Sequence, residues 1–154
     1  MNIGTSQETN LKPEVLLVDD NPADTDLTSE ALSRCSCAHE VRAVPDGVQA
    51  IEFLRRRGKY TAVRSPDLVI LDLNLPGKDG RAVLAEVKTD PALKCTPVVI
   101  FSTSQAKADI RSTMELGANS YVTKPGNLQD FVSTVTSICE YWFKYAVLPP
   151  RKNL

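Results

Sequence analysis

The chain has 154 residues, with 18 lysines and arginines against 19 aspartates and glutamates, for a formal net charge of -1. This length suits one domain with a sizeable core and leaves no room for a second folded domain. The balanced charge lacks the basic excess of nucleic-acid-binding proteins, so we exclude nucleic acid as a partner. No apolar run reaches the ~18 residues of a membrane span, and the polar start MNIGTSQETN does not resemble a signal peptide. We therefore expect a cytoplasmic protein with no membrane segment.

The cysteines at positions 35, 37, 95 and 139 form no C-x-x-C pair, and His39 is the one histidine of the chain. This spacing does not match a zinc site. We expect reduced thiols, as is usual in the cytosol, with Cys35 and Cys37 packing at the end of a helix. His39 is expected to have a structural role.

After a polar, aperiodic segment at residues 1–12, which we expect to be a flexible tail, short apolar runs alternate with longer amphipathic segments. Such alternation is typical of β-α-β units around a parallel sheet. Strands are expected at Val15–Val18, His39–Val44, Leu68–Leu71, Pro97–Phe101 and Ser120–Thr123. The predicted fold class is α/β, with a doubly wound five-stranded parallel sheet.

Capping and stop signals place a helix after each strand: proline or aspartate at the start, and proline or glycine at the end. Helices are expected from Pro22 to about Arg34, from Asp46 to about Arg57, from near Lys78 to before Asp90, from after Ser104 to Gly117, and from Leu128 to about Ala146. Residues 55–66 are expected to form an exposed loop. A single domain over residues 13–148 would then be followed by a short tail at 149–154, with no output domain.

Polar side chains stand at the ends of four predicted strands. The first ends in Asp19 and Asp20, the third in Asp72, the fourth at Ser102, and the fifth at Lys124. Carboxyl ends of parallel strands meet at one crevice, where ligands bind in such sheets. Taken one at a time, these residues could equally be helix caps or surface charges. A cap or surface charge does not explain Asp72, because a carboxylate at the end of a buried strand carries a desolvation cost.

Three acids in one crevice repel each other by roughly 4 kcal/mol per pair at ~4 Å and an effective dielectric of ~20. A magnesium ion would relieve this repulsion, since it prefers carboxylate oxygens, waters and phosphate as ligands. The set also outlines a phosphoryl-transfer site. Asp72 would be the nucleophile, with a lysine and a hydroxyl on the transferred group, and the nearby backbone carbonyl of Asn74 could complete the metal's ligands.

At this point the chain resembles the receiver domain of two-component response regulators, from about Glu14 to Glu140. Five features carry the resemblance at the family's spacing: the β-α alternation, and the motifs VDD at 18–20, DLNLPGKDG at 72–80, FSTS at 101–104 and GANSYVTKP at 117–125. Each motif is weak alone, and the ordered set is specific. The resemblance implies a flavodoxin-like three-layer sandwich with strand order 2-1-3-4-5.

The resemblance also implies roles for the individual residues. Asp72 would be the phosphoacceptor, and Asp19 and Asp20 would hold magnesium together with Asp72 and the carbonyl of Asn74. Lys124 would contact the phosphate, and its bond to the following proline would be cis. The resemblance makes Ser102 the switch hydroxyl and Tyr121 the aromatic residue that turns inward with it. Leu75 and Thr103 differ from the residues common in the family, which leaves the rates of phosphoryl transfer and dephosphorylation open.

A stand-alone receiver signals by binding other proteins. The readout surface would be formed by the fourth helix, the fifth strand and the fifth helix. Aromatic residues extend the last helix and suggest a homodimer through this surface and the extension. The dimer candidates are Tyr141, Trp142, Phe143 and Tyr145, with folding back onto the protein's own core as the alternative. The extension and the DLNLPGKDGRAVLAEVK segment are most similar to regulators of cyanobacterial phytochrome kinases, so the phosphodonor would be a light-sensing histidine kinase.

Three other function classes fit the sequence less well. A haloacid-dehalogenase-type phosphatase needs a second aspartate where the chain has Asn74, together with a cap insertion. A phosphorylation-independent adaptor on a receiver scaffold usually lacks one of the five site residues, which are all present here. A flavin binder would need a glycine-rich phosphate loop after the first strand, where DDNPAD stands instead. We therefore expect a phosphoacceptor protein that catalyses only its own phosphorylation and dephosphorylation.

Overall fold

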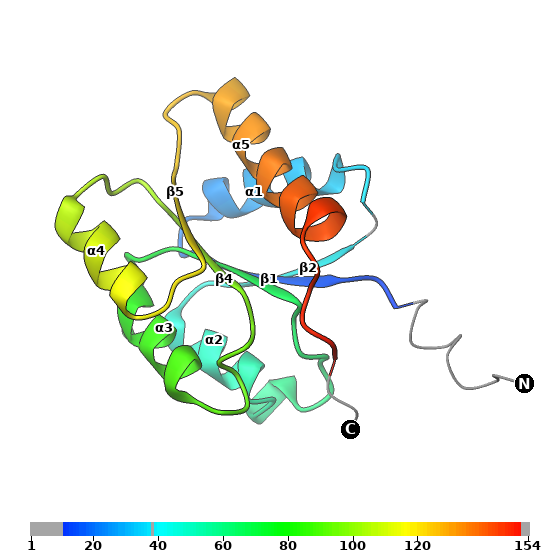
Figure 1. Ribbon diagram of the computed structural model, residues 1–154, viewed down its shortest axis with the longest axis vertical. Coiled ribbons are helices and arrows are strands. Elements are labelled where there is room, and N and C mark those ends of the chain that lie inside the picture. The colour runs from blue at the N-terminus through cyan, green and yellow to red at the C-terminus, as the bar shows by residue number, and fades with distance from the viewer. Residues whose placement is uncertain (1–10, 38, 152–154) are drawn as a thin grey trace, which may run out of the picture.

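The computed structural model describes residues 11–37 and 39–151. Five parallel strands form one sheet in the order β2-β1-β3-β4-β5, with helices on both faces (Figure 1). The strands are β1 (Glu14–Val18), β2 (Glu40–Val44), β3 (Leu68–Leu71), β4 (Val98–Ser102) and β5 (Ser120–Thr123). The predicted fold class, strand order and strand positions are confirmed.

The three inner strands are continuous apolar runs, because helices cover both of their faces. Every residue of β1, β3 and β4 is buried, whereas β2 and β5 lie at the edges and are partly exposed. Their residues feed two cores, one on each face of the sheet. The functional positions after β1 and β3 therefore follow rigid, fully packed strands.

Helices α1 (Pro22–Ser33) and α5 (Leu128–Glu140) cover one face of the sheet, while α2 (Gly47–Leu54) and α3 (Gly80–Thr89) cover the other (Figure 1). Helix α4 (Lys107–Glu115) lies next to β5 and buries only Thr113. Four helices begin at a side chain that accepts hydrogen bonds from the first turn: Asn21, Asp46, Asp79 and Asn127. These caps explain why the helix starts were readable from the sequence.

The segment at 55–66 is more ordered than an exposed loop. Helix α2 ends at Leu54, three residues before the expected Arg57, and Arg56 takes a left-handed φ of 53°. A 3₁₀ turn follows at Gly58–Tyr60. The Tyr60 ring packs 5.2 Å from that of Phe53, and its hydroxyl donates to Gln49 at 2.8 Å. One aromatic side chain thus ties the segment to α2.

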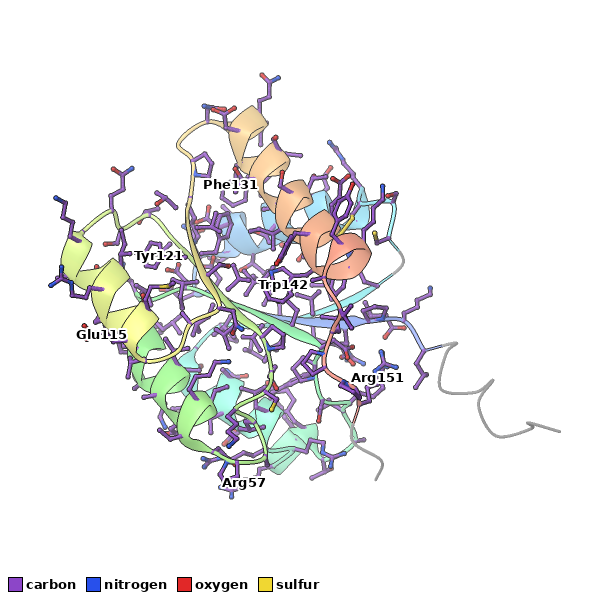
Figure 2. The ribbon with its side chains drawn as sticks, viewed as in Figure 1. Arg57, Glu115, Tyr121, Phe131, Trp142 and Arg151 are labelled. Carbon is purple, nitrogen blue, oxygen red and sulfur yellow. A yellow bond between two sulfur atoms is a disulfide. The ribbon has the colours of Figure 1, made fainter. Side chains whose placement is uncertain are left out.

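The aromatic extension continues α5 as a π-helical turn, Tyr141–Tyr145. Trp142, labelled in Figure 2, and Phe143 pack against the core between the sheet and the α1 and α5 helices. Phe143 also stacks on His39, with ring centroids 5.5 Å apart. Tyr141 and Tyr145 remain 55% and 70% exposed. Trp142 and Phe143, two of the four dimer candidates, therefore pack within the chain, while Tyr141 and Tyr145 are exposed to solvent.

Two expectations about covalent geometry are wrong. Cys35, just after α1, and Cys139 of α5 form a disulfide with Cα atoms 6.6 Å apart, while Cys37 and Cys95 are free thiols. The 104-residue separation hid this pair, which comes together because α1 and α5 pack side by side. The Lys124–Pro125 bond is trans, since the described residues contain no cis peptide. The trans form is the intrinsically preferred isomer even before proline.

Three further expectations concern His39, membrane segments and the N-terminal tail. His39 precedes β2 and its ring contacts the Cys37 carbonyl at 2.6 Å, in agreement with a structural role. Within the described part of the chain, no helix is long and apolar enough to cross a membrane. Of the predicted tail at 1–12, all but Leu11 and Lys12 lies outside the described residues.

Candidate functional site

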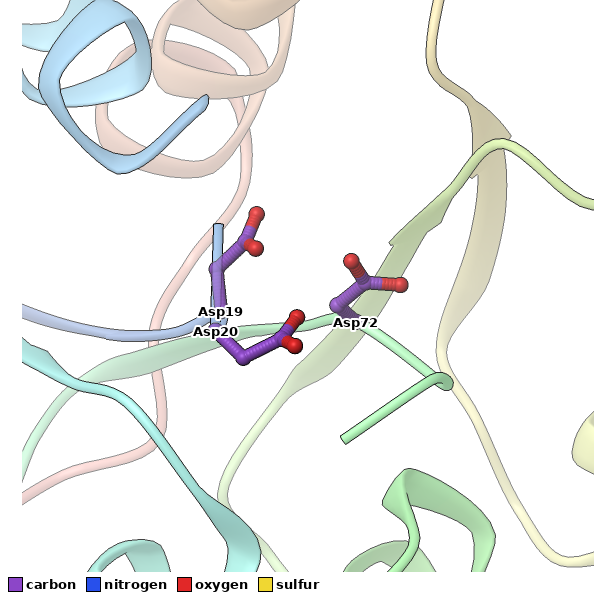
Figure 3. A group of neighbouring side chains, drawn as sticks. All are labelled: Asp19, Asp20 and Asp72. Carbon is purple, nitrogen blue, oxygen red and sulfur yellow. The ribbon is translucent and has the colours of Figure 1, made fainter. Parts of the chain in front are cut away.

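Three carboxylates meet at the carboxyl edge of the sheet. Asp19 and Asp20 follow β1, and Asp72 follows the neighbouring strand β3 (Figure 3). Each offers an oxygen, and these oxygens all lie within 4.8 Å of one another. Asp19 and Asp72 are buried, while Asp20 is exposed. The pairing of β1 with β3 in register, Val18 beside Leu71, brings them together.

Lys124, directly after β5, reaches across the edge to these acids. Its ammonium donates to Asp19 Oδ2 at 2.7 Å, to Asp72 Oδ2 at 2.9 Å and to Asp24 Oδ2 at 2.9 Å. The side chain of Lys124 is 3% exposed. A buried lysine with three carboxylate partners has all three of its protons used.

Burial and hydrogen bonding shift the pKa values of Asp19 and Lys124. Burial raises the pKa of Asp19 above its ordinary value, although the bonds from Lys124 and the Asn21 N–H act in the opposite direction. Burial alone would lower the pKa of Lys124, but its bonds to the three carboxylates outweigh this and raise the pKa above the usual range. Lys124 therefore stays charged at any physiological pH.

The backbone around Asp72 is held from two sides. Its N–H donates to the Val18 carbonyl at 2.9 Å, and its Oδ1 accepts from the Leu73 N–H at 2.7 Å. On the other side Gly80, at the start of α3, approaches so closely that a Cβ there would lie 2.2 Å from the Asp72 carbonyl oxygen. A side chain at position 80 would displace the backbone of Asp72, which explains the glycine.

The two predicted switch residues lie on the neighbouring strands β4 and β5. Ser102 ends β4 fully buried, and its Oγ accepts from the Ser104 N–H at 3.2 Å. Tyr121 on β5 is half-buried between the sheet and α4 (Figure 2), with its hydroxyl donating to the Ser104 carbonyl at 2.8 Å. Ser102 and Tyr121 therefore share one partner, Ser104, which sequence reasoning did not single out.

Asp24 is the site residue that sequence reasoning missed. It lies in the first turn of α1, where an acidic residue is explained by the helix dipole alone. One signal was present in the sequence. Side chains on a helix tilt toward its N-terminus, so in a helix that starts at Pro22 the Asp24 side chain is directed toward the end of the preceding strand. Asn74 is exposed in the turn after β3, and Thr103 is exposed after β4.

The donor set fits a divalent cation. Three carboxylates with closely spaced oxygens are the hard ligands that Mg²⁺, Mn²⁺ and Ca²⁺ share. The single ammonium of Lys124 does not balance the four aspartates around it. A cation would thus supply positive charge where the side chains themselves leave a deficit.

Comparisons with known proteins all identify response regulators. The family model of the response regulator receiver domain matches residues 15–136. The response regulator Rcp1 of a Synechocystis species is 42% identical over 144 residues, which cover 94% of this chain and 98% of Rcp1.

Solved structures agree with this relationship. The phosphorylated cyanobacterial phytochrome response regulator RcpA is 46% identical with a TM-score of 0.88, over 91% of this chain and 100% of RcpA. The Mn²⁺-bound form of Rcp1 is 42% identical with a TM-score of 0.86, over 90% of this chain and 99% of Rcp1.

Proposed function

The chain belongs to the response regulator receiver family and serves in a two-component phosphorelay, and from this premise we propose that Asp72 is its phosphoacceptor. The observation that supports this assignment is the placement of Asp72 at the end of the central strand β3, 2.9 Å from the buried ammonium of Lys124. In the transfer, a carboxylate oxygen of Asp72 attacks the phosphorus of a phosphohistidine. A P–O bond forms, the P–N bond breaks, and the imidazole nitrogen leaves with the electron pair.

The side chains around Asp72 would stabilise the transferring group by charge and hydrogen bonding. Lys124 would shift from the Asp72 oxygen to an oxygen of the phosphoryl group, while Asp19 and Asp24 keep its ammonium in place. The Leu73 N–H on Asp72 Oδ1 would orient the attacking carboxylate. The same groups would act when water removes the phosphate, so the protein would catalyse only its own phosphorylation and dephosphorylation.

Receiver domains bind a divalent metal, and here we propose Mg²⁺. Asp19, Asp20 and Asp72 would supply the carboxylate oxygens, with the backbone carbonyl of Asn74 as a further ligand. When bound, the ion would neutralise charge on the transferring phosphoryl oxygens. Asp20, the exposed member, has no lysine partner among the described contacts and is therefore the acid most available to the ion.

The phosphodonor in this family is a histidine kinase, and we propose a phytochrome kinase for this chain. The similarity to Rcp1 and to the phytochrome regulator RcpA over nearly the full length of both chains supports this choice. Such a kinase uses ATP, so we place the exchange in the cytoplasm. Transfer from a purified phytochrome kinase, compared with an unrelated histidine kinase, would check the assignment.

Phosphorylation adds about -1.5 to -2 charges beside acids that are already crowded. We propose that Ser102 then swings toward the phosphate and Tyr121 packs into the space behind it, which changes the α4-β5-α5 surface. A shift between nearly pure states needs roughly 5.5 kcal/mol, within reach of a few charge-assisted hydrogen bonds. Amide spectra around these two residues should move when Mg²⁺ and beryllofluoride are added.

We also propose a homodimer through the α4-β5-α5 surface and the outward side of the aromatic extension. Tyr141, Tyr145 and Val147 are 55%, 70% and 93% exposed, and an exposed apolar patch of this kind marks a surface for a partner. Sedimentation of Tyr145→Ser against wild type would check this interface, since Trp142 and Phe143 pack inside the chain.

The central assignment is tested by incubation with acetyl phosphate and Mg²⁺, followed by intact mass and Phos-tag electrophoresis. Wild type should gain one phosphoryl group, and Asp72→Ala should gain none. Asp67→Asn is the matched control, because Asp67 and Asp72 are equally buried at 9% exposure, at opposite ends of β3. A wild type without mass gain, or an Asp72→Ala variant that is still modified, would refute the assignment.

A further inference from the structure

Asp24 differs from the other two carboxylates that bind Lys124. Asp19 and Asp72 belong to the group of three acids whose oxygens lie within 4.8 Å of one another, and Asp24 does not. It comes from the first turn of α1, where its side chain is 27% exposed. Among the described contacts of Lys124, Asp24 is therefore the one carboxylate with no proposed role toward the metal or the phosphoryl group.

The start of α1 fixes where Asp24 lies. The Asn21 side chain caps this helix and accepts a hydrogen bond from the N–H of Asp24 at 3.2 Å. The N–H of Asn21 in turn donates to Asp19 Oδ1 at 2.9 Å, so the cap is tied to the end of β1. The Asp24 carboxylate thus reaches Lys124 from a backbone that is anchored to the same strand end as Asp19.

The ammonium of Lys124 occupies a confined place. Its side chain is 3% exposed, and its nitrogen lies 5.8 Å from the centre of the Phe101 ring. Its three protons are donated to Asp19, Asp24 and Asp72. A lysine has a flexible four-carbon stem, so the ammonium stays at one point only while its partners hold it. Without the Asp24 oxygen, one proton of a buried ammonium would lose its acceptor, which is costly, and the ammonium would gain by moving toward water.

We propose that Asp24 is a positioning residue, which holds the Lys124 ammonium within reach of Asp72 and thereby strengthens the binding of the phosphoryl group there. The proposal rests on the function proposed above and adds a residue to the phosphorylation reaction. Asp24 acts through Lys124 and does not itself contact the phosphoryl group. A phosphoryl group on Asp72 leaves the contact between Asp24 and Lys124 in place, because Asp24 is neither the acceptor nor a proposed metal ligand.

The charge and the position of the Asp24 carboxylate act in opposite directions. The negative charge repels an incoming phosphoryl group, so the loss of this charge alone favours binding. The carboxylate oxygen holds Lys124, so the loss of this oxygen disfavours binding. Asp24→Asn removes the charge and keeps an oxygen that accepts from Lys124, whereas Asp24→Ala removes both. The difference between these two variants therefore reports the positioning of Lys124 alone.

The first test is a calorimetric titration of the full chain with beryllofluoride, an analogue of the phosphoryl group, at fixed Mg²⁺. We expect the apparent Kd of Asp24→Ala to be about fivefold higher than that of Asp24→Asn, the ratio typical of one lost hydrogen bond. Asp26→Ala and Asp26→Asn are the matched controls, since Asp26 is an exposed acid on the same helix. These two control variants should have equal Kd values.

The second test observes the ammonium itself in metal-free protein. With lysine labelled by ¹⁵N at Nζ, an ammonium gives an NMR cross-peak when hydrogen bonds and burial slow the exchange of its protons with water. The Lys124 cross-peak is identified by its absence in Lys124→Met. Wild type and Asp24→Asn should show this cross-peak, and Asp24→Ala should lose it. Because neither metal nor phosphoryl group is present, this measurement does not depend on the reaction.

Equal Kd values for Asp24→Ala and Asp24→Asn, or a Lys124 cross-peak that survives in Asp24→Ala, would overturn the positioning role. If wild type itself takes up no beryllofluoride, the proposed phosphoacceptor function fails as well, whereas wild-type binding with equal variants refutes the role of Asp24 alone. Asp24→Leu provides a second route if Asp24→Ala does not fold. It keeps the branched shape of aspartate without an acceptor, and it should behave as Asp24→Ala does.

Discussion

The two ends of the central strands hold buried acids in very different surroundings. At the amino edge of the sheet, Glu14 begins β1 and Asp67 precedes β3, with exposures of 2% and 9%. At the carboxyl edge, Asp19 and Asp72 follow the same two strands with exposures of 4% and 9%. Burial is therefore similar at both edges, and the difference lies in the cations that surround the acids.

At the amino edge, each buried acid has its own arginines. Arg42 and Arg64 lie 3.5 Å and 3.3 Å from the Glu14 carboxylate, and Arg151 lies 3.0 Å from that of Asp67. Asp67 also accepts from the Glu14 N–H at 2.8 Å. Arg151, labelled in Figure 2, ties the end of the described chain to the start of β1 through the Lys12 carbonyl. Fixed arginine side chains therefore pair with both buried acids at this edge.

At the carboxyl edge, one lysine serves several acids. Lys124 bonds to Asp19, Asp24 and Asp72, while Asp20 adds a fourth carboxylate beside them. Buried charge that is not balanced by the protein is costly, and a site of this kind persists where a ligand completes it. The contrast teaches that a shortage of cations, more than burial of the acids, distinguishes a ligand site from a structural ion-pair network.

The largest effect is expected when the carboxyl edge loses its lysine. Lys124→Met leaves Asp19 and Asp72 buried without a positive partner, so the free energy of unfolding in metal-free buffer should fall by about 3–5 kcal/mol. Mg²⁺ should restore part of this loss. Urea unfolding measures both, with the exposed Lys107→Met on α4 as the control. A loss no larger than that of the control would contradict the dependence of the edge on Lys124.

A smaller loss is expected at the amino edge. Asp67→Ala removes the acceptor of the Glu14 N–H and the partner of Arg151, which leaves a buried donor unpaired. The free energy of unfolding should fall by about 2 kcal/mol, and Mg²⁺ should not recover it. If Mg²⁺ restored the free energy of unfolding of Asp67→Ala as fully as that of Lys124→Met, the carboxyl edge would not differ from the amino edge in its need for a cation.

The smallest effect has the opposite sign. Asp20→Ala removes an exposed acid from a crowded group, so metal-free protein should gain about 1 kcal/mol of stability from reduced repulsion. The same change removes a proposed metal ligand, so added Mg²⁺ should stabilise the variant less than wild type. Thermal unfolding with and without Mg²⁺ measures both. Destabilisation in the absence of metal would mean that Asp20 is already satisfied within the protein.

Much of the fold was predictable because its signals are local. Continuous apolar runs marked β1, β3 and β4, and Pro22 and Asp46 marked the starts of the first two helices. The carboxylates of the site were predictable for a topological reason, since every parallel strand delivers its last residues to the same edge. Strand order came from the family resemblance and not from the residues alone.

What escaped prediction depends on pairing between distant segments. The Cys35–Cys139 disulfide and the Arg151–Asp67 ion pair join positions far apart in sequence, and no local pattern announces them. Asp24 was hidden because a helix dipole already explains an acid in a first turn. Knowing that α1 packs against α5 would have revealed the disulfide, so these misses reflect tertiary packing and not weak local signals.

The central claim, that Asp72 at the cation-poor edge accepts the phosphoryl group, is tested most directly by locating the modification. Borohydride reduces an aspartyl phosphate to homoserine, which leaves a stable mark for peptide mass spectrometry after treatment with acetyl phosphate and Mg²⁺. The account predicts homoserine at position 72 and unmodified aspartate at positions 19, 20, 24 and 67. Homoserine at any of those four positions, or none at position 72, would contradict it.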